Sequence, residues 1–332
     1  MIDVSEVIEN IEYHKQNVLE RRARRPGISE LDQLAETHEQ WKLLKTTLTN
    51  ARHAQKVAGF EVQTATTEDA KNAALKRALE VKQFILSQER HLNGLDKSVQ
   101  GVALSIPNTT HRDAPVGPEP CAVVKSKHGP EPMPPSELRD HVPIMESLGM
   151  VEFKAASLVV GGSWYYLRGA GALLETALTN YALSVAIKHG WEPFATPDAI
   201  RTEVASRCGF QPRDVNTAGN AEVHHLYHLE DTSGDLVLTG TAEIPLASLY
   251  ANQTLTEQDM VERFPIKMVG VGHAFRSEAG ARGKDTRGLY RVHQFTKVEL
   301  FALTGEEESE GFMEEMLSLQ RDIFSGLGFP YR

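Results

Sequence analysis

Cysteine is scarce in this chain, and long hydrophobic runs do not occur in it. Two cysteines, Cys121 and Cys208, are present in 332 residues. This excludes a disulfide framework and a cysteine zinc site, and it is typical of a reducing, intracellular setting. Because no run of about 18 uninterrupted apolar residues occurs, we expect no membrane-spanning helix. The N-terminal MIDVSEVIEN is acidic and has no apolar segment, which argues against a secretory signal and an Arg-rich transit peptide.

Positive charge is in deficit, with 35 Lys and Arg against 45 Asp and Glu and a formal net charge of -10. A general nucleic-acid binder needs local Lys and Arg for its phosphate contacts, so the overall balance argues against one. Residues 276–297 are an exception, because this segment contains six basic residues and only two acidic ones, Glu278 and Asp285. This basic segment predicts a site for an anionic ligand. A second cluster, RRARR at 21–25, is equally well explained as a solvated helix end.

The first hundred residues are strongly helical in pattern. Residues 1–25 predict one short helix that ends at Pro26-Gly27. Two long helices are predicted from about 29 to 59 and from about 68 to 100, with Thr67 as the cap of the second. Their heptad-like apolar positions and short polar link predict an antiparallel coiled-coil hairpin, an arm of roughly 45 Å. The seam of this arm is predicted to include Leu34, Leu48, Leu75, Leu79, Leu86 and Val99.

The rest of the chain reads as a linker and an α+β domain. Proline-rich residues 105–145 predict an irregular linker between an N-terminal domain, 1–104, and a second domain, 146–332. In that domain we expect a helix at 169–190, a strand in WEPFATP (191–197), and a closing helix at about 306–326. Three further strands are expected in DLVLTGTAEIPLASL, PIKMVGVGHAFRSE and YRVHQFTKVELFAL.

Two familiar motifs are incomplete in this chain, and a histidine cluster has a simpler explanation than a metal site. GAGALL lacks the third glycine of a dinucleotide fingerprint, and RGKDT lacks the first glycine and the Ser or Thr of a P-loop. HHLYH, which holds His224, His225 and His228, is better explained by polar positions on a strand edge than by a zinc site.

Charged residues alternate with apolar ones in the predicted strands around the basic segment. With a period of two, Phe295, Lys297 and Glu299 share one face with Arg291 and His293, and the more apolar Val292 to Leu300 set shares the other. Arg276 is expected to share a strand face with Glu278, and Thr241 with Glu243. A solvated sheet face would explain any one of these residues. The whole set is better explained by a nucleotide site: arginines for phosphate, a ring for a base, and carboxylates for amines.

The chain resembles a family, the seryl-tRNA synthetases, which are class II aminoacyl-tRNA synthetases. FRSEAGARGKDTRGLYRVHQFTKVEL (275–300) resembles motif 2, TGTAE (239–243) resembles the serine-site signature, and KHGWEPFATP resembles motif 1, the dimer-interface strand. The two-helix arm is similar to the tRNA-binding coiled coil of the family. The resemblance implies a fold in which this arm precedes a class II antiparallel sheet domain flanked by helices.

The resemblance also implies site residues. Arg276 would be catalytic and hold both the α-phosphate of ATP and the serine carboxylate. The implied ATP-binding residues are Arg276, Ser277, Glu278, Arg291, Val292 and Phe295. The implied serine-binding residues are Thr241, Ala242, Glu243, Arg276 and Glu299, with Glu299 reading the serine hydroxyl. ATP and Mg²⁺ are the implied cofactors, and no metal-ligating side chain is assigned.

Partners and location follow from the same resemblance. L-serine and tRNA(Ser) are the implied substrates, with the tRNA meeting the arm and the 279–290 loop, and a homodimer without membrane contact is implied. The details of motif 2 are closer to bacterial and organellar members, which favours the mitochondrial matrix over the cytoplasm. Motif 3 of the family lies beyond Arg332, so an alternative is a truncated, non-catalytic paralogue that binds tRNA or a synthetase partner.

Overall fold

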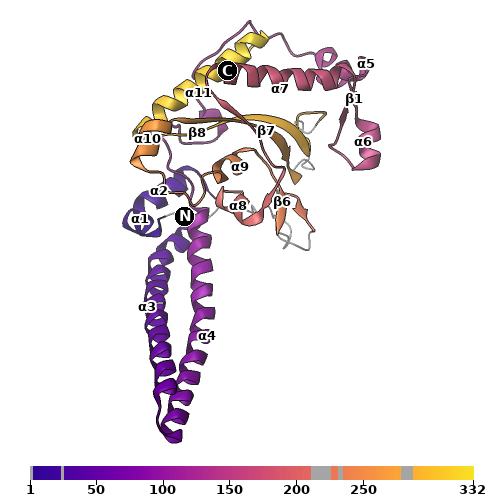
Figure 1. Ribbon diagram of the computed structural model, residues 1–332. Coiled ribbons are helices and arrows are strands. Elements are labelled where there is room, and N and C mark those ends of the chain that lie inside the picture. Colours follow the sequence, from indigo (N-terminus) through magenta and orange to yellow (C-terminus); the bar gives the residue numbers. More distant parts are fainter. Residues whose placement is uncertain (1–2, 24–25, 211–225, 231–234, 278–286) are drawn as a thin grey trace. The chain divides into compact units, whose positions relative to one another are not determined.

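A computed structural model describes residues 3–23, 26–210, 226–230, 235–277 and 287–332 (Figure 1). The chain forms two compact units, Met1–Val123 and Val124–Arg332. The boundary between the units lies inside the proline-rich segment 105–145. The finer division into 1–104, 105–145 and 146–332 stays a prediction.

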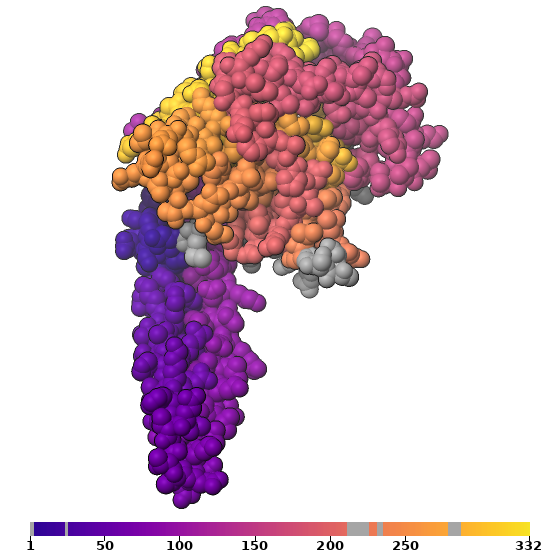
Figure 2. Space-filling model, viewed as in Figure 1, coloured from indigo at the N-terminus to yellow at the C-terminus, as the bar shows by residue number. Residues whose placement is uncertain are grey.

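The first unit is dominated by two long helices, α3 (Ile28–Thr64) and α4 (Glu68–Ser105), which pack along each other as the predicted arm (Figures 1 and 2). Thr67 caps α4, because its hydroxyl accepts a hydrogen bond from the Ala70 amide. At 37 residues, α3 is about 55 Å long, which is more than predicted.

The predicted apolar seam of the arm is partly wrong. Leu34, Leu48 and Val99 are buried as predicted, but Leu75, Leu79 and Leu86 of α4 are exposed. The α4 residues that are buried against α3 include Ala74 and Ile85, each one position before a predicted leucine. A hairpin of two helices buries a single narrow stripe, so a shift of one residue moves the predicted leucines out of the interface.

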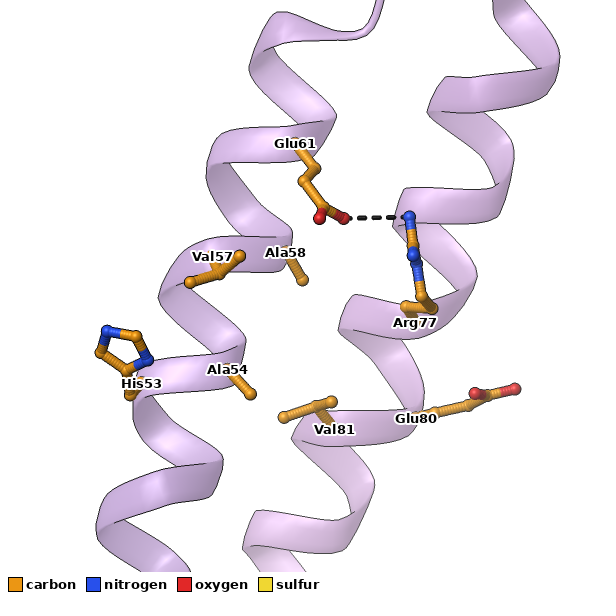
Figure 3. Close-up of a pocket in the computed structure, with 8 residues that line it drawn as sticks. All are labelled: His53, Ala54, Val57, Ala58, Glu61, Arg77, Glu80 and Val81. Atoms are coloured by element: carbon orange, nitrogen blue, oxygen red, sulfur yellow. Dashed lines mark ion pairs between the residues drawn. The ribbon is translucent and has the colours of Figure 1, made fainter.

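A hollow of about 420 Å³ interrupts the packing of the arm (Figure 3). Ala54 and Ala58 of α3 are too small to fill the space opposite Val81 of α4, and the Glu61–Arg77 ion pair, 2.9 Å long, lies at one side. None of the residues predicted to bind ATP or serine lines this hollow.

The predicted single helix over residues 1–25 is wrong. Two helices, α1 (Val4–Glu9) and α2 (Ile11–Glu20), meet at Asn10. Asn10 leaves helical geometry, with φ -110° and ψ 31°, and its side chain binds back to Glu6. Short polar side chains compete with the helix for backbone hydrogen bonds in this way. Val4 and Val7 of α1 pack with Leu34 and Val99 in one core cluster.

The second unit is built on a sheet with the strand order β3 (Glu192–Ala195), β7 (Ile266–Phe275) and β8 (Gln294–Leu303). β7 and β8 form the predicted antiparallel hairpin, in register from Ile266 opposite Leu303 to Phe275 opposite Gln294. β3 joins β7 in parallel, so the described sheet is mixed. The fold class, a helical arm followed by a sheet domain with flanking helices, is confirmed.

Two helices, α7 (Ala170–Lys188) and α11 (Ser309–Leu327), cover one face of this sheet. Trp191, Val269 and Phe312 lie in the buried core between them, and Val298 and Leu300 of β8 pack against it. The predicted alternation along β8 is therefore confirmed on its apolar face. Phe295, Lys297 and Glu299 are left on the opposite face, where the site lies.

A smaller sheet, in the order β4 (Ala199–Arg201), β6 (Leu236–Leu238) and β5 (His228–Leu229), packs with α8 (Thr202–Arg207) and α9 (Glu243–Ser248). The remaining helices and strands of the described part are short. They are α5 (His141–Ser147), β1 (Val151–Glu152), α6 (Phe153–Val159), β2 (Tyr166–Leu167) and α10 (Glu257–Arg263), with 3₁₀ turns at Glu119–Cys121, Glu137–Arg139 and Glu306–Glu308.

The long strand predicted over DLVLTGTAEIPLASL is wrong beyond Leu238. The hydroxyl of Thr239 donates to the Thr241 carbonyl at 2.7 Å and turns the chain, and α9 then begins at Glu243. Pro245 lies in the first turn of α9, where its missing N–H costs no helical hydrogen bond. Thr241 and Glu243 therefore do not share a strand face.

Helix α7 is long and apolar enough, by length and composition alone, to cross a membrane. It is the one helix of the described ranges that meets these criteria. The sequence predicted this helix at 169–190 but no membrane-spanning helix. Glu175 in this helix nevertheless accepts a hydrogen bond from Thr296 of β8 at 2.7 Å, and Leu183 and Ala186 pack on the sheet. These contacts give the helix a role in covering the sheet.

Candidate active site

The centre of the site is a contact between two predicted serine-binding residues, Thr241 and Glu299. The Thr241 hydroxyl lies 2.6 Å and 2.7 Å from the two carboxylate oxygens of Glu299, and the Ala242 amide also donates to this carboxylate. Thr241 is 2% exposed and Glu299 is 6% exposed. A buried carboxylate is stable only when donors surround it. This network supplies donors from a segment 58 residues away in the chain.

Lys297 completes this network, although the sequence counted it only as one of the basic residues of 276–297 and implied no individual role for it. Its ammonium group donates to the Thr241 hydroxyl at 3.0 Å and forms an ion pair with Glu299. The cation balances the buried carboxylate charge. Lys297 lies two residues before Glu299, so the two-residue period of a strand places both side chains on the same face. This spacing could have identified Lys297 from the sequence.

Two glycines of β7 make room for neighbouring side chains, Gly270 for Leu246 and Ala242, and Gly272 for Thr196. Gly270 lies opposite Glu299 and Gly272 opposite Lys297 in the β7–β8 pair. A Cβ on Gly270 would lie 2.8 Å from a methyl group of Leu246 and 3.3 Å from the Ala242 Cβ. A glycine within a strand often marks a site where another part of the chain approaches the strand closely. The two glycines of MVGVGHAF carry this signal in the sequence.

Arg276 lies one residue beyond β7, rather than within it as predicted. Its guanidinium group is 5.3 Å from the centre of the Phe295 ring, and its Nε donates to the Gly240 carbonyl at 3.4 Å. The predicted phosphate ligand, the predicted base-stacking ring and the serine-site segment are therefore neighbours. A cation over an aromatic face is also a stable resting position for the arginine.

A cluster of three rings holds the Arg276 backbone. The Arg276 amide donates to the His293 carbonyl at 2.9 Å, and His293 Nδ1 lies 2.9 Å from the Arg276 carbonyl and 2.6 Å from the Tyr227 hydroxyl oxygen. Trp164 stacks on the His293 ring with centroids 5.5 Å apart. Burial raises the pKa of Tyr227. Sequence reasoning missed Tyr227 and Trp164.

The other predicted site residues are placed less centrally. Glu243 is exposed at the start of α9, and its charge, after burial, contributes to raising the pKa of Cys208. No contact found in the described part of the chain joins it to Glu299 or Arg276. Ser277 is half-buried, Val292 is buried and Arg291 is exposed. Arg291 and His293 precede β8 instead of lying in it, so their predicted strand face is wrong.

Some predictions concern residues that the structure does not describe. Glu278, predicted to bind adenine, lies outside the described residues, as do positions 279–286 of the predicted tRNA-contacting loop and His224 and His225. Within the described ranges, no group of three or more His, Cys, Asp or Glu side chains is placed to hold a metal ion.

The unit that carries the site matches a model of a known protein class. Residues 227–332 match the class II tRNA synthetase core domain of the glycine, histidine, proline, serine and threonine group. This segment contains Thr241, Arg276 and Glu299. The unit that carries the site is therefore a class II synthetase core.

The remainder of the chain specifies the family. Residues 1–110 match the seryl-tRNA synthetase N-terminal domain. A serine–tRNA ligase of Rubrobacter xylanophilus is 36% identical over the whole chain, which covers 74% of that protein. The mitochondrial serine–tRNA ligase of Saccharomyces cerevisiae is 35% identical over 99% of the chain and 71% of its own length. The Pyrococcus horikoshii seryl-tRNA synthetase, solved in complex with ATP, superposes with a TM-score of 0.75 at 27% identity, over 100% of this chain and 76% of that one. The chain belongs to the seryl-tRNA synthetase family.

Proposed function

We propose that this chain activates L-serine with ATP to form seryl-adenylate and transfers the seryl group to tRNA(Ser). The observation that carries the proposal is the network of buried Thr241, Ala242 and Glu299 with the half-buried Lys297, beside Arg276 and Phe295. Membership of the seryl-tRNA synthetase family supports it.

Arg276 and Phe295 suit the nucleotide. Phe295 offers a flat face on which adenine can stack. Arg276 would hold the α-phosphate and the serine carboxylate, and it would stabilise the negative charge that develops as the carboxylate attacks phosphorus and pyrophosphate leaves. Val292 and Arg291 would line the nucleotide. Ser277 and Glu278, which follow β7 in the chain, would bind ATP as well. The ATP complex of the archaeal relative supports a nucleotide site in this fold.

Glu299 suits the serine hydroxyl. Its carboxylate already accepts from Thr241, Ala242 and Lys297, which uses about three of roughly four acceptor positions. A substrate hydroxyl could donate to the position that remains. Thr241 and Glu243 would hold the ammonium group. A site built to bind a hydroxyl rejects an analogue that lacks it by about 10⁴ or more, so alanine should be refused.

Mg²⁺ would bind at this site only together with ATP, through the oxygens of its phosphates. Mg²⁺ is commonly held by one or two carboxylates together with substrate phosphates. The buried carboxylate of Glu299 is already engaged by protein donors, so it is a poor additional ligand. When bound, the ion would neutralise phosphate charge, and we assign it to no protein side chain.

The tRNA and a second subunit would use other surfaces. The arm, α3 and α4, and the 279–290 loop are the proposed tRNA contacts, and the family match over residues 1–110 supports the arm. Leu173, Leu174 and Leu178 of α7 are exposed. Apolar side chains gathered on one exposed helix indicate a surface that another chain covers. We propose a homodimer formed through α7 and β3.

The mitochondrial matrix is the proposed location, and the cytoplasm is the alternative. The yeast mitochondrial relative supports the first proposal, and the bacterial relative leaves the second open.

The test is ATP–pyrophosphate exchange by the 332-residue protein with L-serine, L-alanine or L-threonine as the amino acid. Exchange that requires serine, with little from alanine, is the expected result. If serine produces no exchange while the protein still binds tRNA, the activation proposal is wrong and the non-catalytic, tRNA-binding alternative stands.

A further inference from the structure

The chain that returns toward β8 is held by the start of α5. Arg287 Nη1 lies 3.0 Å from Asp140 Oδ2, and the Leu289 amide donates to His141 Nε2 at 3.0 Å. The Tyr290 ring meets the His141 ring edge-on, with centroids 4.5 Å apart. We call these contacts of Asp140 and His141 with residues 287–290 the loop clamp.

Gly288 fits the loop clamp because it has no side chain. Its φ is +62°, a left-handed conformation that glycine adopts without cost. A Cβ at this position would collide with the ring of His141 and with Val142. Each of the four consecutive residues from 287 to 290 therefore touches the start of α5, which is more than a single chance contact.

The clamp defines the proton position on His141. Because a backbone amide can only donate, Nε2 must be unprotonated to accept from Leu289, and the ring proton lies on Nδ1. Nδ1 is buried and 3.1 Å from Asp140 Oδ1, although the two are not aligned for a hydrogen bond. Asp140 also caps α5 by accepting from the Val142 amide at 3.0 Å. The aspartate thus favours the tautomer that the loop requires.

The clamp acts outside β7 and β8, although two ATP candidates, Arg291 and Val292, follow it directly in the chain. Arg276 and His293 are joined by their own hydrogen bonds, and Phe295 and Glu299 lie within β8. These positions are determined by the sheet. Loss of the clamp would release residues 287–290 and leave Arg276, Phe295 and Glu299 in place.

We propose that His141 and Asp140 are positioning residues for the second step, the transfer of the seryl group to tRNA. By holding residues 287–290, they orient the end of the loop proposed to meet the tRNA acceptor end. This inference rests on the proposed function. It predicts a specific separation, in which the clamp matters for transfer and matters little for adenylate formation.

The test uses His141→Ala, with His141→Gln as a conservative variant whose side-chain oxygen can accept from the Leu289 amide. His189→Ala is the control, because His189 also lies near an aspartate, Asp322 at 3.4 Å, but at the end of α7. Hydrogen exchange of peptides covering 287–293 reports the clamp without requiring activity. Serine-dependent pyrophosphate exchange and transfer from preformed seryl-adenylate to tRNA report the two steps.

We expect His141→Ala to speed hydrogen exchange at 287–290 and to slow transfer about tenfold to a hundredfold, as misplacement of a reacting partner does. Pyrophosphate exchange should change by less than about threefold, and His141→Gln should recover much of the transfer rate. Unchanged hydrogen exchange, or equal loss of both steps, refutes the inference. Absence of serine-dependent exchange in the wild-type protein refutes the proposed function instead, and hydrogen exchange at 287–290 then decides whether the clamp exists.

Discussion

Replacing Thr241 with valine tests the central contact of the site. The substitution keeps the branched shape and removes one hydroxyl. That hydroxyl donates to Glu299 at 2.6 Å and 2.7 Å and accepts from Lys297 at 3.0 Å. Because Thr241 is 2% exposed, water cannot easily replace the lost donor.

The expected cost follows from the charge of the acceptor. A hydrogen bond to a charged group contributes about 1.5–3 kcal/mol. Glu299 keeps the Ala242 amide and the Lys297 ammonium, so its carboxylate is not left without partners. We therefore expect Thr241→Val to lower the free energy of unfolding of the second unit by about 2 kcal/mol, within that range.

Urea unfolding of the full chain measures this change, and Thr296→Val is the matched control. Thr296 lies on the opposite face of β8 and donates to Glu175 at 2.7 Å, but both residues are only half-buried. The control should cost about 1 kcal/mol or less. Equal costs for the two variants, or a cost below about 0.5 kcal/mol for Thr241→Val, would refute the assignment of Thr241 as a principal donor to Glu299.

Four further predictions concern the site, the sheet, the arm and acid stability. Glu299→Ala should lose the discrimination of serine from alanine in pyrophosphate exchange, and an unchanged ratio rejects its role in reading the hydroxyl. Gly270→Ala should lower stability by about 1–3 kcal/mol in urea unfolding, because its Cβ would meet Leu246 of α9; a neutral effect would show that α9 can move away from the sheet. Deleting residues 29–100 should weaken tRNA charging and spare adenylate formation, whereas equal loss of both would make the arm structural. Hydrogen bonds within the capping box of α10 lower the pKa of Asp259 in the folded protein. The ionised carboxylate therefore stabilises the fold above the pKa of the unfolded state, about 3.9. This stabilisation is lost as the pH falls through the lower pKa of the folded state. Asp259→Asn should therefore make stability less dependent on pH in that acidic range, as urea unfolding at several pH values would measure.

The sequence predicted helices and strands correctly where one hydrophobic periodicity determines the structure of a segment. The β7–β8 hairpin, the apolar face of β8 and the two arm helices all follow from spacing within one segment. The prediction was wrong where a side chain competes with the backbone, as Asn10 does between α1 and α2 and Thr239 does before α9. Such a contact depends on one hydroxyl or amide, which an average over a window does not detect.

The sequence by itself determined the family, the arm and the side of β8 on which Phe295, Lys297 and Glu299 would lie. Only the tertiary structure decided that Thr241 would meet Glu299 across 58 residues, and that Asp140 and His141 would hold residues 287–290. The physical reason is that alternation encodes which face of a strand is polar, whereas the segment that covers that face is selected by the packing of distant parts of the chain. Gly270 shows how the two are joined, because its missing side chain makes room for a segment that no local pattern identifies.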